Sequence, residues 1–164
     1  MTRFKICGLR ELGPALVAAD SGADFIGFVF IPGVRRQVTP KHAEAVIKEF
    51  RRLRCGGPPR VVGLFANQPV DDVIRIAGQC RLDLAQLCGD EPPEYWDAVG
   101  VPVIKQIKVR DRDNSEWTAE STHREVAKVI SHGHRAMLDS HRKGSLGGTG
   151  KTFDWSVAAA LSGD

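Results

Sequence analysis

Short apolar, β-branched runs alternate along the chain with longer amphipathic stretches, and each run is bounded by Gly, Pro or charged residues. Such runs are typical of buried strands, and the amphipathic stretches are typical of helices. The pattern predicts six strands: Phe4 to Cys7, Asp24 to Phe30, Arg60 to Ala66, Leu82 to Leu87, Val101 to Val109 and Arg135 to Asp139.

Helix start signals lie in the intervals between these runs. They are a proline in the first helical turn or a Thr or Asp at the N-cap. The predicted helices run from Pro14 to about Ser21, from the Thr39-Pro40 pair, from Pro69, over Glu91 to Ala98, over Ser121 to Ile130, and from near Asp154 to the end of the chain.

Alternation of strands and helices predicts βαβ units and a parallel sheet, and therefore an α/β fold. Two architectures share this pattern: a doubly wound open sheet with helices on both faces, and a (β/α) barrel. Both place function at the carboxyl ends of the strands. Polar or reactive residues fall at several of these ends, namely Cys7, Asn67, Gln86 and Asp139.

The length of the chain limits how complete a barrel could be. The 164 residues predict one domain, spanning 1–164. A complete eight-stranded α/β barrel takes about 250 residues. The chain as given should therefore not close a full barrel. Strand starts lie roughly 20 to 35 residues apart, so about six βα units fit.

Charge and hydropathy narrow the expected partners. The net charge of +3 favours an anionic ligand but is too small for a nucleic-acid-binding surface. The chain has no apolar run of about 18 residues and no apolar leader after Met1. We therefore expect no nucleic-acid partner, no membrane partner and a cytoplasmic location.

Four cysteines could in principle form disulfides or bind a metal. Cys7, Cys55, Cys80 and Cys88 form no C-x-x-C pair and no Cys/His cluster with zinc spacing. We therefore expect no metal site and no disulfide scaffold.

Residues at three strand ends are candidates for chemistry. Cys7 follows Lys5 by two positions, so both side chains share one face, where an ammonium could stabilise a thiolate. Asp139 ends an apolar strand, a costly place for a carboxylate unless it is paired or lies in the mouth of an active site. Arg35 and Arg36 could bind a carboxylate or phosphate. Taken singly, Cys7 is better interpreted as an inert buried thiol and Arg35 and Arg36 as a solvated pair. For Asp139, a helix cap or a loop ion pair is as open as a catalytic role.

A glycine-rich segment from Gly144 to Thr152 contains Gly-Lys-Thr and suggests a phosphate-binding loop. The P-loop pattern G-x-x-x-x-G-K-[ST] requires glycine where this chain has Ser145. This departure argues against a nucleoside triphosphatase. A loop that bends over a ligand and a plain connection to a helix both remain possible.

Seven segments taken together resemble a known family. K-I-C-G stands near the start of the chain and G-G-T-G-K-T-F-D-W near its end, and five further segments lie between them in the same order. The chain is similar over essentially its whole length to phosphoribosylanthranilate isomerase, on the segments Lys5 to Gly8, Gly22 to Phe30, Arg36 to Val38, Val62 to Asn67, Leu82 to Glu91, Leu138 to Ser140 and Gly147 to Trp155.

The resemblance implies a fold, a reaction and roles for three residues. The family is a (β/α)8 TIM barrel of tryptophan biosynthesis that rearranges N-(5-phosphoribosyl)anthranilate, a small phosphosugar, without a cofactor. By this resemblance Cys7 would be the general base, Asp139 the general acid, and Arg36 the residue that holds the anthranilate carboxylate. Opening the sugar ring needs a proton donor, and the later step needs an acceptor for a carbon-bound proton, which suits these residue types.

Two positions depart from the family pattern, which usually has His where this chain has Cys88 and Ser where it has Val34. Neither is the proposed acid or base. The sister isomerase of histidine biosynthesis would carry Asp in place of Cys7, so Cys7 favours the tryptophan enzyme.

Loops after the seventh and eighth strands of such barrels commonly bind the substrate phosphate. We therefore expect the chain to be a fragment that is weakly active or inactive by itself. The alternative is a non-catalytic domain that binds phosphosugars or has a regulatory role.

Overall fold

A computed structural model describes residues 2–54, 57, 59–109, 119–140 and 155–161. Strands and helices alternate through these ranges as the sequence predicts. The elements are β1 (Lys5–Cys7), α1 (Leu12–Asp20), β2 (Phe25–Val29), α2 (Pro40–Leu53), β3 (Arg60–Phe65), α3 (Val70–Gln79), β4 (Leu84–Leu87), α4 (Pro93–Ala98), β5 (Val103–Val109), α5 (Ala119–Ser131), β6 (Arg135–Ser140) and α6 (Ser156–Ala160).

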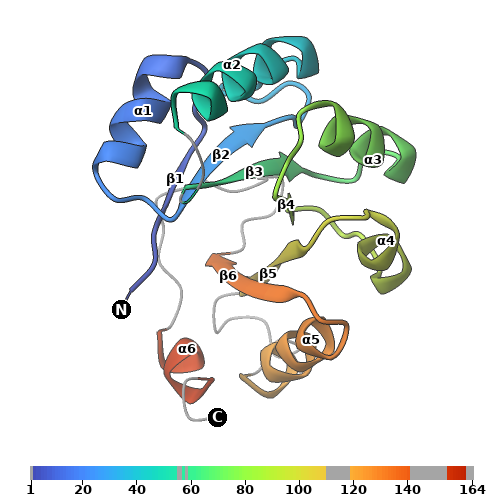
Figure 1. The fold of residues 1–164 in the computed structure, drawn as a ribbon. Helices are drawn as coiled ribbons and strands as arrows, with labels where there is room; N and C mark the ends of the chain where they lie inside the picture. The colour runs from blue at the N-terminus through green and yellow to red at the C-terminus, as the bar shows by residue number, and fades with distance from the viewer. Residues whose placement is uncertain (1, 55–56, 58, 110–118, 141–154, 162–164) are drawn as a thin grey trace.

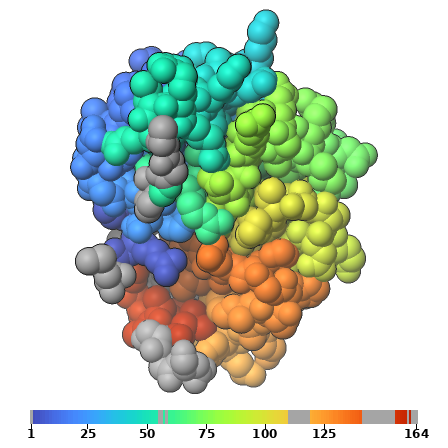
Figure 2. Space-filling model, in the orientation of Figure 1, coloured from blue at the N-terminus to red at the C-terminus, as the bar shows by residue number. Residues whose placement is uncertain are grey.

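The strands form one parallel sheet in the order β1-β2-β3-β4-β5-β6, so each strand pairs with its neighbours in sequence. The sheet curls, and α1 to α5 follow one another around its outer side (Figure 1). Figure 2 shows the same order at the surface, where the colours change progressively around the molecule. A doubly wound sheet has helices on both faces and a reversal in strand order. The fold is therefore the curled (β/α) type, with six βα units.

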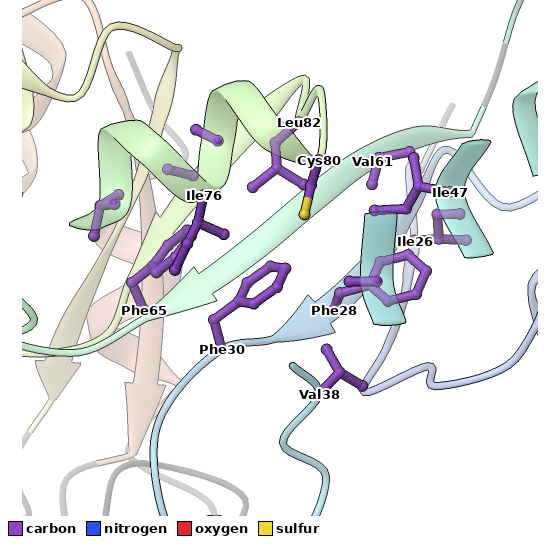
Figure 3. Packing of buried hydrophobic residues seen from close by; sticks show 14 of the residues in the cluster. Ile26, Phe28, Phe30, Val38, Ile47, Val61, Phe65, Ile76, Cys80 and Leu82 are labelled. Carbon is purple, nitrogen blue, oxygen red and sulfur yellow. The ribbon is translucent and has the colours of Figure 1, made fainter. Parts of the chain in front are cut away.

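Apolar side chains between the sheet and the helices form the larger of two buried clusters. Phe28 and Phe65 have no solvent-exposed surface, and they pack with Ile47 of α2 and Ile76 of α3 (Figure 3). Burying a side chain of this size contributes about 2 kcal/mol to stability. This outer layer fixes the helices against the strands.

The side chains that alternate with this outer set point to the concave face of the sheet. Their apolar members form a second, inner cluster of Val29, Ile31, Val62, Leu64, Leu84 and Cys88. Side chains two positions apart on a strand point to the same face of the sheet. A residue that belongs to the inner cluster therefore shows that its i±2 neighbours also point to the concave face.

Helix boundaries agree closely with the start signals. The Thr39 side chain accepts a hydrogen bond from the backbone N–H of His42 at 3.3 Å, which confirms the predicted cap. α1 begins at Leu12, and Pro14 lies inside its first turn, where a missing N–H is tolerated. α6 begins at Ser156; the predicted cap at Asp154 lies outside the described residues.

α4 begins at Pro93, two residues later than the sequence predicts. The physical reason is local: Glu91 and Pro92 each precede a proline, which disfavours helical backbone, and Pro92 is extended with ψ of 168° as the N-cap.

In the part of the chain that the structure describes, no helix combines the length and the apolar character needed to cross a bilayer.

Candidate active site

Cys7 lies at the carboxyl end of β1 with its side chain on the concave face. It is half-buried and packs against the inner cluster. Cys7 pairs in register with Gly27 of β2, where a β-carbon would come 2.9 Å from Cys7 Sγ. The absence of a side chain at Gly27 therefore leaves the space that the thiol occupies.

Arg36 extends from the segment after β2 to Cys7. Its Nη1 donates a hydrogen bond to the carbonyl oxygen of Cys7 at 2.9 Å. The guanidinium stem lies over Gly8, which has φ of +79°, and a β-carbon there would come 2.5 Å from Arg36 Cδ. The left-handed backbone favours glycine at position 8, and a β-carbon there would displace the Arg36 side chain from its present path. Arg36 remains exposed and has further N–H donors, as a binding residue would.

Asp139 lies near the carboxyl end of β6, opposite Lys108 of β5 in the register. Lys108, Gln106 and Ile104 alternate along one face of β5, and Ile104 packs against the inner cluster, so Asp139 also points to the concave side. Its Oδ2 accepts a hydrogen bond from Gln106 Nε2 at 2.6 Å, and its Oδ1 accepts one from the Ser140 N–H at 2.9 Å. The carboxyl group is half-buried and held at both oxygens.

The three predicted residues therefore lie at carboxyl ends on the concave side. Arg36 contacts Cys7, and Asp139 comes from β6, the strand at the other edge of the sheet. An acid and a base on different strands can face one ligand from different sides, which a two-proton rearrangement requires.

Lys5 lies on the same face as Cys7, as predicted, but its ammonium is directed to the far side of the concave face. Lys5 Nζ donates a hydrogen bond to Gln86 Oε1, and Gln86 Nε2 donates one to Cys88 Sγ at 3.3 Å. Burial raises the pKa of the Cys88 thiol to about 11, although the hydrogen bond from Gln86 and the charge of Lys5 oppose the rise. Cys88 is thus a neutral thiol at the end of a polar chain that crosses the interior.

A buried ion pair supports the carboxyl ends of β4 and β5. Lys105 Nζ contacts Glu91 Oε2 at 2.7 Å, and their side chains are 9% and 1% exposed. Lys105 also donates to the Gly89 carbonyl at 2.6 Å. Asn67, with φ of +56°, joins this group, because its side-chain oxygen accepts from the Asp90 N–H at 2.7 Å.

Sequence reasoning missed Glu91, Lys105 and Gln106. One signal was available for two of them, since β5 carries three polar residues, Lys105, Gln106 and Lys108, between apolar ones in a strand that is otherwise buried. Polar groups in such a strand need partners.

A cleft of about 430 Å³ opens between the β4–α4 segment, β5 and α5. Its lining includes the residues from Gly89 to Pro93 and from Lys105 to Lys108, with Glu125 and Lys128. Neither Cys7, Arg36 nor Asp139 lines it, so this cleft is not the place where the predicted residues converge.

No group of three or more His, Cys, Asp or Glu residues suited to a metal ion occurs within the described ranges. Cys7, Cys80 and Cys88 are free thiols there. The glycine-rich segment from Gly144 to Thr152 and Cys55 lie outside the described residues.

Residues 4–163 match the family model described as N-(5'-phosphoribosyl)anthranilate (PRA) isomerase. The chain is 44% identical over 162 residues to N-(5'-phosphoribosyl)anthranilate isomerase of Geobacter sulfurreducens, covering 98% of this chain and 71% of that protein.

Solved structures agree with the sequence relatives. Phosphoribosyl anthranilate isomerase from Thermotoga maritima superposes with a TM-score of 0.77 at 31% identity, over 98% of this chain and 72% of that one. A phosphoribosyl anthranilate isomerase in complex with reduced 1-(o-carboxyphenylamino)-1-deoxyribulose 5-phosphate superposes with a TM-score of 0.73 at 28% identity, over 98% and 70% of the two chains.

Proposed function

The chain belongs to the N-(5'-phosphoribosyl)anthranilate isomerase family, and from this membership we propose how its own residues divide the work of the reaction. The reaction is the Amadori rearrangement of N-(5-phosphoribosyl)anthranilate to 1-(2-carboxyphenylamino)-1-deoxy-D-ribulose 5-phosphate, a step of tryptophan biosynthesis. The observation that carries the proposal is the presence of Cys7 and Asp139 on one concave face, at the carboxyl ends of β1 and β6.

Asp139 acts first, as the general acid. It gives a proton to the ring oxygen of the ribose while the bond from that oxygen to C1 breaks. The lone pair of the anthranilate nitrogen then forms the C1=N bond of a Schiff base. Two hydrogen bonds, from Gln106 and Ser140, support this role because they fix the plane of the carboxyl group.

Cys7 acts second, as the general base. Its thiolate takes the proton from C2, and the electron pair of that bond becomes the C1=C2 bond while the C1=N pair returns to nitrogen. The resulting enolamine becomes a ketone when C1 gains a proton and the C2 hydroxyl loses one. These transfers restore Asp139 and Cys7 to their initial states. The sequence of steps moves protons only, so the proposal requires no cofactor.

Arg36 binds the anthranilate carboxylate in this proposal. Its position supports the assignment, because a guanidinium anchored on the Cys7 carbonyl would place the bound carboxylate close to the base. Its remaining N–H groups match a carboxylate in a bidentate geometry.

The proposal includes a phosphosugar as the small-molecule partner, without nucleic acid or membrane, and a cytoplasmic location for a chain folded as one domain. The free thiols of Cys7, Cys80 and Cys88 support a reducing compartment. A family relative solved with a reduced form of the product supports the phosphosugar.

Turnover of N-(5-phosphoribosyl)anthranilate, followed by its fluorescence, tests the proposal in the purified chain extended by the remaining C-terminal part of the Geobacter sulfurreducens relative. The extension is needed because the chain covers 71% of that protein and we expect little activity from it alone. The extended chain without substitutions is the reference for every kcat and KM comparison.

Cys7→Ala and Asp139→Asn should each reduce kcat by at least about 100-fold. Two control variants make the same chemical changes elsewhere. Cys80→Ala removes a thiol at the C-cap of α3, Asp72→Asn removes a carboxylate in the first turn of α3, and both should leave kcat unchanged. Binding of a product analogue without any turnover in the extended chain would contradict the proposal and favour a binding domain.

A further inference from the structure

Gln106 is a buried polar residue whose side chain donates a hydrogen bond to the proposed acid. It lies in the middle of β5 and is only 5% exposed. A buried amide costs free energy unless it is hydrogen-bonded, and an apolar side chain of similar size would pack there without that cost. Its Nε2 donates to Asp139 Oδ2 at 2.6 Å.

The lysine that pairs with Asp139 in the strand register makes its ion pair with another residue. Lys108 stands directly opposite Asp139, yet its ammonium pairs with Asp90 at 2.8 Å, on the segment after β4. Within the described part of the chain, the side chain that hydrogen-bonds the Asp139 carboxyl is therefore a neutral amide. Asp139 also accepts from the backbone N–H of Ser140.

We propose that Gln106 is a positioning residue that holds the Asp139 carboxyl group in one orientation both before and after proton transfer, an inference that rests on the proposed function. A primary amide is suited to this task because it carries a donor and an acceptor at the end of one stem. Nε2 donates to Asp139 Oδ2 in the structure, the contact that suits the carboxylate left after proton transfer. A half-turn of the amide presents Oε1, which accepts from the protonated acid.

Other residue types would serve only one of the two states. A lysine at this position would favour the carboxylate and oppose its reprotonation, and a glutamate would repel the carboxylate after transfer. Methionine would fill the same space without either hydrogen bond. Gln106 thus acts by orienting the Asp139 carboxyl group and does not touch the reacting atoms itself.

Gln106→Met tests the proposal with a side chain of similar volume. We expect kcat to fall 10-fold to 100-fold while KM changes by less than about 3-fold, because the substrate contacts remain and only the orientation of the acid is lost. Gln79→Met is the matched control, since Gln79 Nε2 makes the same kind of contact with Glu44 Oε2 at 2.9 Å between α3 and α2. Its kcat should equal that of the unmodified chain.

Gln106→Glu supplies a second test through the pH profile. Two adjacent carboxyl groups share one proton, so the alkaline limb of kcat/KM should move to higher pH than in the unmodified chain. An unmoved limb would contradict the placement of position 106 beside the acid that limits kcat/KM.

A spectroscopic measurement tests the contact without turnover. In a ¹⁵N–¹H spectrum, the side-chain NH₂ signals lost in Gln106→Met identify Gln106, and these signals should shift in Asp139→Asn. Unchanged NH₂ signals in Asp139→Asn, or an unchanged kcat in Gln106→Met, would overturn the role of Gln106 alone. No turnover in the extended chain without substitutions would instead overturn the proposed function.

Discussion

The Cys7 thiol occupies the space above Gly27, and a β-carbon at position 27 would come 2.9 Å from Cys7 Sγ and 3.2 Å from Leu64 Cδ1. The two residues also pair in register between β1 and β2. The position of the proposed base is therefore set by its neighbour in the sheet as well as by its own strand.

Gly27→Ala should displace the thiol. Gly27 does not have a positive φ, so the substitution changes packing and not the backbone conformation. We expect kcat to fall at least 10-fold and the melting temperature to fall by a few degrees, because Cys7 and Leu64 must both move. Gly78→Ala on α3, where a β-carbon meets nothing within 4 Å, is the control and should leave kcat unchanged. Unchanged kcat in Gly27→Ala would contradict the fixed placement of the thiol.

Arg36→Lys should weaken substrate binding more than it slows the chemical step. Lysine keeps the positive charge but loses the planar fork that can bind the Cys7 carbonyl and a carboxylate together. We expect KM to rise at least 10-fold with a smaller change in kcat. Arg35→Lys changes the neighbouring exposed arginine and should leave both constants as they are. Equal effects of the two substitutions would contradict the assignment of Arg36 as the residue that binds the substrate carboxylate.

Cys88 should make the fold sensitive to alkaline pH. Burial raises the pKa of its thiol from about 9 to about 11 in the folded chain, so the unfolded chain loses the proton first as pH rises. The stability that the buried neutral thiol provides is complete below pH 9 and is lost progressively towards pH 11, by about 2 kcal/mol.

Urea unfolding at pH 8 and at pH 10.5 measures this effect. Cys88→Ala should lose less stability between the two pH values than the unmodified chain does. Val29→Ala, a truncation in the same inner cluster, should follow the unmodified chain. Parallel loss in all three proteins would show that Cys88 does not titrate as expected.

Lys105→Met should be strongly destabilising, because it leaves the buried Glu91 carboxylate without its cation. Breaking a buried ion pair from one side costs about 3–5 kcal/mol. Glu91→Gln in the same chain should recover much of the loss, since an amide oxygen still accepts from the N–H groups of Asn67 and Gly89. Arg124→Ala breaks the exposed pair with Glu120 and should cost less than 1 kcal/mol. Chemical denaturation measures all of these differences.

The strands were predictable because each is a short apolar run bounded by turn residues, and the six predicted strands differ from the observed ones by at most two residues at either end. The Thr39 cap was predictable for the same reason, that the signal is local. The curl of the sheet could not be read from the alternation of strands and helices, which does not specify the side on which the helices lie. It was implied by the resemblance to a barrel family, and the structure confirms it.

Contacts across strands could not be read from the sequence. Lys5 shares a face with Cys7, yet its ammonium reaches Gln86, 81 residues away. The contact between Gln106 and Asp139 depends on the pairing of β5 with β6, and no local pattern gives that register. The sequence therefore pointed to the candidate acid, base and arginine but not to the residues that orient them.

The strand order β1 to β6 is also the order in which the ribosome makes the strands. A nascent chain can add each βα unit to the edge formed by the preceding unit, without waiting for a distant partner. Each strand after β1 therefore has a native partner that has already been synthesised when it leaves the ribosome. No pairing in the described sheet waits for a later segment of the chain.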